Sequence, residues 1–401
     1  MKMSKGLNRR SFLRNVGMAA AGAMVGCNKV LPGLDVTDAT NNSVNTASAI
    51  KNLGKLPKWK GFNLNEFFQP DPWYWQGPTP EEYFKWMADW GFDFVRIPVA
   101  YPTYIKIPPY EKNITVDNVY SFNEAGVNKI ERTIYLAHKY NLHVSLCLHR
   151  APGYCVSTGY NEPFNLWLDQ SARDAFYKHW WFWANRFKNV SAGKISFDLL
   201  NEPCFRANIN DPASPTSAVS PITYRSIAQT ATDIIRKENP AYIVIADGNN
   251  GGATAVPELA DLRIGQSCRG YTPFEISHYR APWVYPDPAY QPIPLWPGTV
   301  GGQYFSRALL EEHYKPWIEL AKQGVGVHCG ECGCWKETPH DVFLAWFGDV
   351  LDILGTNGIG FSLWEFKGDF GILNSNRADA QYENWYGYQL DRKLLTLLQS
   401  K

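Results

Sequence analysis

Short apolar runs alternate along the chain with longer segments in which apolar residues recur every three or four positions. From about Lys58 onward, the runs have the length of buried strands, and the longer segments have the spacing of helices that cover a sheet. Strands are expected at 60–64, 92–98, 143–149, 195–200, 242–246, 261–267, 324–331 and 359–364. Helices are expected at 80–90 (with Thr79 as N-cap), 123–140, 170–188, 221–238, 306–323, 340–355 and 389–399. This alternation predicts an α/β fold, a single (β/α)8 TIM barrel over residues 58–401.

The first 57 residues have a different pattern. Asn8 to Arg14, with its paired arginines and Phe-Leu, is typical of a twin-arginine export signal, and the apolar run behind it is too short to span a bilayer. Gly26-Cys27 resembles a lipoprotein processing site, although Met24 stands where Leu is usual. The alternative is cleavage nearby with Cys27 incidental. We expect a signal segment at 1–27, a flexible tether at 28–57, export by the twin-arginine route, and membrane contact only through a lipid on Cys27.

Composition narrows the choice of partner. The net charge is +1, which gives no basis for binding nucleic acid or an acidic polymer. Aromatic residues make up 15% of the chain, more than a core of this size ordinarily needs. Most are expected in the core, and a minority to line a cleft and stack on sugar faces. Candidates for the cleft are Trp73 and Trp75 after the first strand, and Trp283, Tyr285 and Trp296 in the long loop 280–303.

Two glutamates occupy the same position relative to an apolar run. Glu202 follows the run 195–200 and is itself followed by Pro203, which cannot continue a central strand. Glu331 ends the run that starts at Gly324. In a barrel, the carboxyl ends of all strands meet at one mouth. Two carboxylates in one cleft are what a retaining glycosidase needs, because one protonates the leaving oxygen while the other attacks the anomeric carbon. Their mutual repulsion raises the pKa of one of them.

The chain from about Lys58 resembles glycoside hydrolase family 5, the cellulase-like retaining glycosidases. The matching pieces are Gly61-Phe62-Asn63-Leu64, Val95-Arg96-Ile97-Pro98, Leu148-His149, Asn201-Glu202-Pro203, Gly330-Glu331 and Leu363-Trp364, in that order at successive strand ends. The resemblance implies Glu202 as acid/base and Glu331 as nucleophile. It further implies that Arg96 positions the nucleophile, Asn201 binds the sugar 2-hydroxyl, His149 lines the same subsite and Trp364 stacks there.

One position departs from the family pattern. The family usually carries His-x-Tyr at the end of strand six, and this chain has Arg269-Gly270-Tyr271. Tyr271 can still hydrogen-bond to Glu331. Arg269 puts a fixed cation in place of an imidazole, and we expect it to reach the substrate and set specificity. The alternative is that Arg269 forms a structural ion pair with a carboxylate. His278, a little further on, is expected to reach the cleft.

The cysteines raise the question of a metal. Cys329, Cys332 and Cys334 include a zinc-like Cys-x-x-Cys spacing, but a second such pair is missing. Strand alternation would also turn Cys332 and Cys334 away from Glu331. We therefore expect buried thiols, no metal and no cofactor, with a disulfide among the eight cysteines left open.

These observations predict a monomeric retaining glycosidase that cleaves a β-linked glucan or mannan, with a polysaccharide or oligosaccharide as its partner. Two alternatives stay open. Loop 280–303 would make the enzyme exo-acting or specific for side chains if it closed one end of the cleft. A barrel that binds carbohydrate without cleaving it is the other alternative, and the presence of both carboxylates counts against it.

Overall fold

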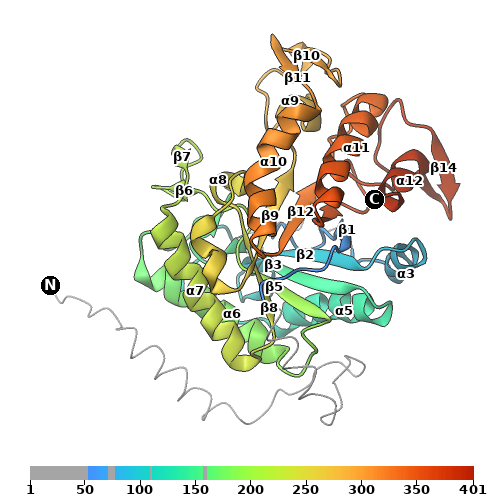
Figure 1. Ribbon diagram of the computed structural model, residues 1–401. Helices are drawn as coiled ribbons and strands as arrows, with labels where there is room; N and C mark the ends of the chain where they lie inside the picture. The colour runs from blue at the N-terminus through green and yellow to red at the C-terminus, as the bar shows by residue number, and fades with distance from the viewer. Residues whose placement is uncertain (1–52, 71–76, 109–110, 157–159) are drawn as a thin grey trace.

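The computed structural model describes residues 53–70, 77–108, 111–156 and 160–401 (Figure 1). The expected signal segment, Cys27, most of the tether and the aromatic residues Trp73 and Trp75 lie outside the described residues.

Eight parallel strands close into a barrel, which confirms the expected fold (Figure 1). The ring closes because β1 pairs with both β2 and β13, and β2 also pairs with β3. In order around the barrel, the strands are β1 (Lys60–Asn63), β2 (Phe94–Ala100), β3 (His143–Ala151), β5 (Ile195–Asp198), β8 (Ile243–Asp247), β9 (Gly265–Gly270), β12 (Val327–Cys332) and β13 (Gly360–Leu363). A two-residue strand, β4 (Tyr154–Cys155), adds to β3 in the antiparallel sense.

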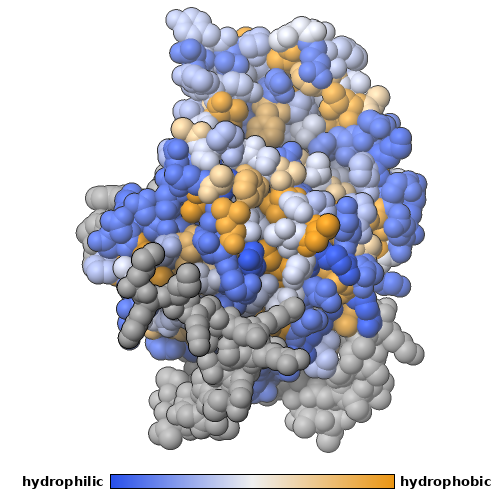
Figure 2. Space-filling view, turned by 90° about the vertical axis from the view of Figure 1, so that its left-hand side faces the viewer, coloured by the Kyte–Doolittle hydropathy of each residue, from blue (hydrophilic) through white to orange (hydrophobic). Residues whose placement is uncertain are grey.

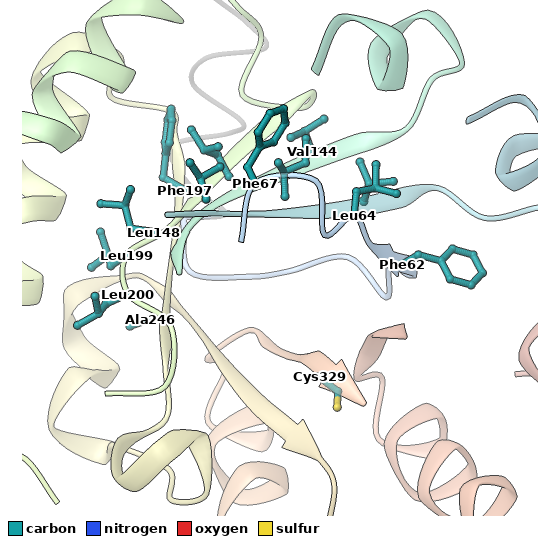
Figure 3. Close-up of a cluster of buried hydrophobic side chains, with 14 of the residues drawn as sticks. Phe62, Leu64, Phe67, Val144, Leu148, Phe197, Leu199, Leu200, Ala246 and Cys329 are labelled. Atoms are coloured by element: carbon teal, nitrogen blue, oxygen red, sulfur yellow. The ribbon is translucent and has the colours of Figure 1, made fainter. Parts of the chain in front are cut away.

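The strands are buried on both faces, as parallel strands covered by helices must be. Every residue of β2 and of β3 is buried. Figure 3 shows side chains from neighbouring strands, among them Val144, Leu148, Phe197 and Ala246, which belong to one buried hydrophobic cluster.

Helices pack around the barrel (Figure 1). They are α3 (Glu81–Asp89), α5 (Glu124–Lys139), α6 (Gln170–Arg186), α7 (Pro221–Glu238), α10 (Arg307–Lys322), α11 (His340–Thr356) and α12 (Arg392–Gln399). Asn123 caps α5 by accepting the N–H of Ala125. The expected N-cap Thr79 is wrong: Pro80 occupies that position, and the Thr79 hydroxyl instead donates to Glu66 at 2.8 Å.

Short elements modify the loops. Between β8 and β9 the chain forms α8 (Asn249–Gly252) and a 3-10 helix (Pro257–Leu262), so the sixth barrel strand starts at Gly265 rather than at 261. The last helix starts three residues later than expected because residues 388–391 pair in a hairpin. The other short elements are α4 (Val116–Val119), α9 (Phe274–Ser277), two further 3-10 helices at Tyr101–Tyr104 and Pro288–Tyr290, and the hairpins β6 (Phe205–Arg206)–β7 (Thr216–Ser217), β10 (Gly298–Val300)–β11 (Gln303–Phe305) and β14 (Tyr382–Trp385)–β15 (Tyr388–Asp391).

The amino-terminal end of the barrel is filled by rings. Trp59 stacks on His143 with ring centroids 4.0 Å apart, and it also stacks on Phe94. Trp59, Phe94 and Ile245 form a small buried cluster of their own. With this end closed by packing, the polar residues of the strands gather at the carboxyl end.

The helix side of the barrel is mixed in character. Figure 2 views the side on which α6 and α7 lie and shows hydrophobic residues interspersed with hydrophilic ones. Ile222, in α7, is 81% exposed. Among the described residues, no helix combines the length and apolar character needed to cross a membrane.

Candidate active site

Glu202 lies just beyond β5 in a strained backbone conformation. Its φ is +49°, in the left-handed region that non-glycine residues rarely adopt. Two side chains hold its peptide groups: Asp247 accepts the Glu202 N–H at 2.9 Å, and the Tyr154 hydroxyl donates to the Glu202 carbonyl at 2.5 Å. The Glu202 side chain is 20% exposed. The strain directs a carboxyl group into the barrel mouth while the chain turns out of the barrel at Pro203.

Glu331 lies in β12 and is almost fully buried. Arg96 Nη1 donates to its Oε1 at 2.7 Å, and the Tyr271 hydroxyl donates to its Oε2 at 3.3 Å. The pairing of β12 with β9 shifts register between Cys329 and Glu331, which sets Glu331 opposite Arg269. The structure thus places Arg96 and Tyr271 against Glu331, as expected.

Arg269 connects the two glutamates. Its Nε donates to Glu202 Oε1 at 2.9 Å, and its Nη2 lies 3.4 Å from Glu331 Oε1. Both of its Nη atoms also donate to Asp247, and Nη2 donates to Asn201 at 3.0 Å. The guanidinium is buried and directs its donors at protein acceptors. The structure therefore places Arg269 in an ion-pair network, which is the alternative interpretation of its sequence.

Asn201 is held in one orientation by the two arginines. Its Oδ1 accepts from Arg96 Nη2 at 2.9 Å and from Arg269 Nη2 at 3.0 Å. Its Nδ2 is buried and has no hydrogen-bond partner among the described residues. Because buried donors are rarely left unsatisfied, this amide is suited to donate to a ligand hydroxyl.

Three rings form an aromatic cluster near the ends of β1, β3 and β13. His149 stacks on Trp364 at 5.7 Å between centroids, and the edge of Phe68 meets both rings at 5.6 Å. Burial, with the charges of Arg96 and Arg269, lowers the pKa of His149 to about 3, so the imidazole is neutral. Such a surface suits the apolar face of a sugar.

A second aromatic cluster starts at Tyr271. Its ring meets the edge of His278 at 5.0 Å, and His278 contacts Phe370 at 5.6 Å and Trp283 at 6.1 Å. Trp283 meets the edge of Trp335 at 4.6 Å and is 58% exposed. His278 therefore joins the site through Tyr271, and the cluster continues outward into loop 280–303.

The sequence interpretation did not single out two buried aspartates. Asp198 ends β5 and accepts Arg96 Nε at 2.8 Å. Asp247 ends β8 and contacts Arg269 and the Glu202 backbone. Asp247 follows the apolar run 242–246, as Glu202 follows the run 195–200, and that position is a signal that could have identified it. Asp198 lies inside the run 195–200 and carries no such signal.

Charge and burial give the carboxyl groups different acidities. Burial and the negative charge of Glu331 raise the pKa of Glu202 to about 7, against the lowering effect of Arg269. Burial and Asp247 raise the pKa of Asp198 to about 7. Burial opposes the ionisation of Asp247, but Arg269 and Arg96 hold its pKa below the ordinary value. A protonated Glu202 beside ionised partners is the arrangement that general acid catalysis requires.

The cysteines near the site are thiols. Cys147, Cys204, Cys268, Cys329, Cys332 and Cys334 are all buried and form no disulfide. The register shift in β12 removes the simple alternation expected there, and Cys329 and Cys332 both approach Gly270. Within the described residues, no group of three or more His, Cys, Asp or Glu side chains is placed to hold a metal ion.

Comparisons with known proteins agree with this geometry. The family model described as Cellulase (glycosyl hydrolase family 5) matches residues 40–370. Endoglucanase C of Acetivibrio thermocellus is 27% identical over 322 residues, which cover 74% of this chain and 87% of that protein. Cellodextrinase A of Ruminococcus flavefaciens is 29% identical over 284 residues, which cover 69% of this chain and 74% of that protein.

Solved structures share the barrel. A crystal structure described as a glycoside hydrolase superposes with a TM-score of 0.76 at 35% identity, and the match covers 86% of this chain and 99% of the other.

Proposed function

Because the chain belongs to glycosyl hydrolase family 5, the cellulase family, and is thus a hydrolase of O-glycosidic bonds, we propose that it cleaves β-linked glucans by double displacement. One observation carries this proposal. The carboxyl groups of Glu202 and Glu331 both form ion pairs with the guanidinium of Arg269. One of them, Glu202, has a pKa raised to about 7.

In the first step, Glu331 attacks the anomeric carbon and Glu202 gives its proton to the leaving oxygen. The bond from the sugar to the aglycone breaks, and an ester between the sugar and Glu331 forms. In the second step, Glu202 takes a proton from water, and the water oxygen displaces Glu331. Arg96, 2.7 Å from Glu331, is placed to orient the nucleophile. The Nδ2 of Asn201, which has no hydrogen-bond partner among the described residues, is suited to donate to the sugar 2-hydroxyl.

The substrate assignment draws on the relatives. The curated relatives described above are named as an endoglucanase and a cellodextrinase, which supports a glucan rather than a mannan. Two aromatic clusters lie near the carboxyl pair, one formed by Phe68, His149 and Trp364 and one extending from Tyr271 to Trp283. Sugar units held on both clusters would place an internal bond at the carboxylates, which favours cleavage within chains over exo action.

We further propose that the protein is exported by the twin-arginine route, on the basis of Arg9-Arg10. Replacement of both arginines by lysine should leave the precursor in the cytoplasm. Normal export of that variant would contradict this route.

The test of the activity is product analysis on cellulose, mixed-linkage glucan, mannan, xyloglucan and arabinoxylan. We expect shortened oligosaccharides from a glucan, with retained configuration by NMR. Release of single sugars from chain ends would show exo action, a preference for mannan would correct the substrate, and inversion would remove double displacement.

A second test addresses Glu202. In Glu202→Ala, substrates with poor leaving groups should lose nearly all activity, while aryl glycosides of acidic phenols should still form the glycosyl-enzyme. Added azide should then restore turnover, with a product of retained configuration. An equal loss on every substrate, without rescue by azide, would contradict the role of Glu202 as acid/base.

A further inference from the structure

We propose that Asp247 is a positioning residue that holds the carboxyl group of Glu202 in place. Asp247 contacts the backbone of Glu202 directly, and it reaches the side chain of Glu202 through Arg269. This inference rests on the proposed role of Glu202 as acid/base. Asp247 has no solvent exposure, and the Tyr224 hydroxyl donates to its carbonyl at 2.7 Å. Asp247 is therefore fixed and acts through its neighbours rather than on substrate.

The first connection is to the strained turn at Glu202. Asp247 Oδ2 accepts the Glu202 N–H at 2.9 Å. A left-handed conformation is strained for a non-glycine residue and persists only when the surroundings enforce it. A hydrogen bond to an ionised acceptor is stronger than one to a neutral acceptor, so the carboxylate stabilises this turn.

The second connection balances the charge of Arg269. An arginine 2.9 Å from a general acid favours the ionised, inactive form of that acid. Asp247 accepts hydrogen bonds from both Nη atoms of Arg269 and so places a negative charge on the other side of the guanidinium. Arg269 can then orient Glu202 through Nε without removing its proton. An Arg–Asp pair thus takes the place in which the family usually carries a histidine.

A count of charges supports this assignment. The charged and titratable groups around Asp247 and Glu202 comprise the guanidiniums of Arg96 and Arg269, the carboxyls of Asp198 and Glu331, and the neutral or weakly acidic Cys147, His149, Tyr154, Cys204, Tyr224, Tyr271 and His328. Two guanidiniums balance two of the four carboxylates. The other two carboxyl groups are favoured in the protonated form, because an uncompensated buried charge is costly. Removal of either member of the Arg269–Asp247 pair should therefore change how strongly Glu202 holds its proton.

The test compares three variants by the pH dependence of kcat/KM. Asp247→Asn leaves the charge of Arg269 unopposed, so the pKa of Glu202 should fall. Since the acid must be protonated to act, the pH at which kcat/KM falls on the basic side of the profile (the basic limb) should decrease by about one unit. Arg269→Gln removes the cation and should move the basic limb to higher pH. The double variant Asp247→Asn/Arg269→Gln should return the limb toward its original position.

Substrate choice separates positioning from general damage. At a pH below the new basic limb, Asp247→Asn should still lose more activity on poor leaving groups than on acidic phenols, because the proton donor is misplaced. Asp391→Asn is the matched control: Asp391 is equally buried and pairs with His340 at 2.7 Å, outside the network described above. This control can lower stability but should leave the basic limb unchanged.

The outcomes are distinct. The inference would be overturned if the basic limb stayed in place in both single variants, or moved in the same direction in both. It would also be overturned if Asp247→Asn lost equal activity on substrates with all leaving groups. If Asp247→Asn does not fold, the double variant decides: a basic limb at the same pH as in Arg269→Gln would overturn the inference, and a limb moved back toward the original pH would support it. Failure of the proposed function would appear separately, as a Glu202→Ala variant that keeps its activity on poor leaving groups.

Discussion

Asn201 combines two tasks at one side chain. Its oxygen accepts from Arg96 and Arg269, and this fixes Nδ2 as the group that faces away from them. A free donor already oriented before substrate arrives loses little entropy on binding. The amide is therefore suited to a hydrogen bond that strengthens in the transition state.

Asn201→Ala should reduce kcat/KM on an ordinary glycoside roughly 100-fold, because hydrogen bonds to the 2-hydroxyl strengthen in the transition state. The measurement compares this substrate with its 2-deoxy analogue in both enzymes. On the analogue, the variant should lose much less than 100-fold. A loss of equal size on both substrates would show that Asn201 acts only by holding the arginines.

At the level of residues, the sequence predicted the position of most of the site. Glu202, Glu331, Arg96 and Tyr271 lie together because each belongs to a motif within or just after a barrel strand. The environment of Arg269 was not predictable in the same way. Its partner Asp247 is 22 residues away in sequence, and the contact between the two side chains depends on the register in which β8 pairs with β9.

The pairing of β9 with β12 sets the position of Glu331 along the barrel axis. The register of this pairing shifts between Cys329 and Glu331. The two strands are packed so closely at Gly270 that an added Cβ would lie 2.4 Å from Cys332 Cβ and 3.1 Å from Cys329 Sγ. Neither distance leaves room for a methyl group. Glycine is therefore required where β9 passes the nucleophile strand.

Gly270→Ala should destabilise the protein by about 1–3 kcal/mol through overpacking and should lower kcat, because β12 must move to relieve the contact. Gly193→Ala is the matched control, since the nearest atom to an added Cβ there is Ser191 Oγ at 3.5 Å. Thermal unfolding and kcat of both variants provide the measurement. Unchanged kcat in Gly270→Ala would contradict this account of the strand pair.

At the level of elements, long periodic segments were predicted and short ones were not. The helix at 221–238 has the predicted bounds because Pro221 suits a first helical turn and the apolar spacing continues to the end. The hairpins β6–β7, β10–β11 and β14–β15 were missed because their short strands are mostly not buried and lack the apolar runs by which barrel strands of four residues were predicted. The β12 register shift was missed because a bulge depends on the neighbouring strand.

For the molecule as a whole, the closed end of the barrel makes stability sensitive to acid. Burial lowers the pKa of His143 to about 3, and this ring stacks on Trp59. The unfolded chain binds a proton at this residue near pH 6.5, whereas the folded protein does not until about pH 3. Stability from this group is therefore complete above pH 6.5 and falls as the pH decreases from there toward 3.

His143→Gln should reduce the slope of unfolding free energy against pH between about 6 and 4 by about 1.4 kcal/mol per pH unit. Urea unfolding across that pH range measures the slope. Trp59→Phe is the control, since it weakens the same packing without removing a titrating group and should keep the original slope. An unchanged slope in His143→Gln would show that this histidine is not the acid-sensitive group.

The order of strands around the barrel followed from the alternation of elements, since parallel strands with helical connections lie next to one another. The polar end of the barrel also followed from the sequence, because the motifs stand at the carboxyl ends of the strands. The balance of two arginines against four carboxyl groups did not follow, since it depends on residues from β2, β5, β8, β9 and β12 meeting in three dimensions.

Trapping with an activated 2-deoxy-2-fluoro β-glucan oligosaccharide tests whether Glu331 forms a covalent bond with the sugar. The fluorine slows both steps, and the activated leaving group lets the first proceed, so the intermediate accumulates. After digestion, mass spectrometry should find one sugar adduct, on the peptide that contains Glu331, and Glu331→Ala should carry none. An adduct on Glu202 or elsewhere, or hydrolysis with inversion and no adduct, would contradict the assignment.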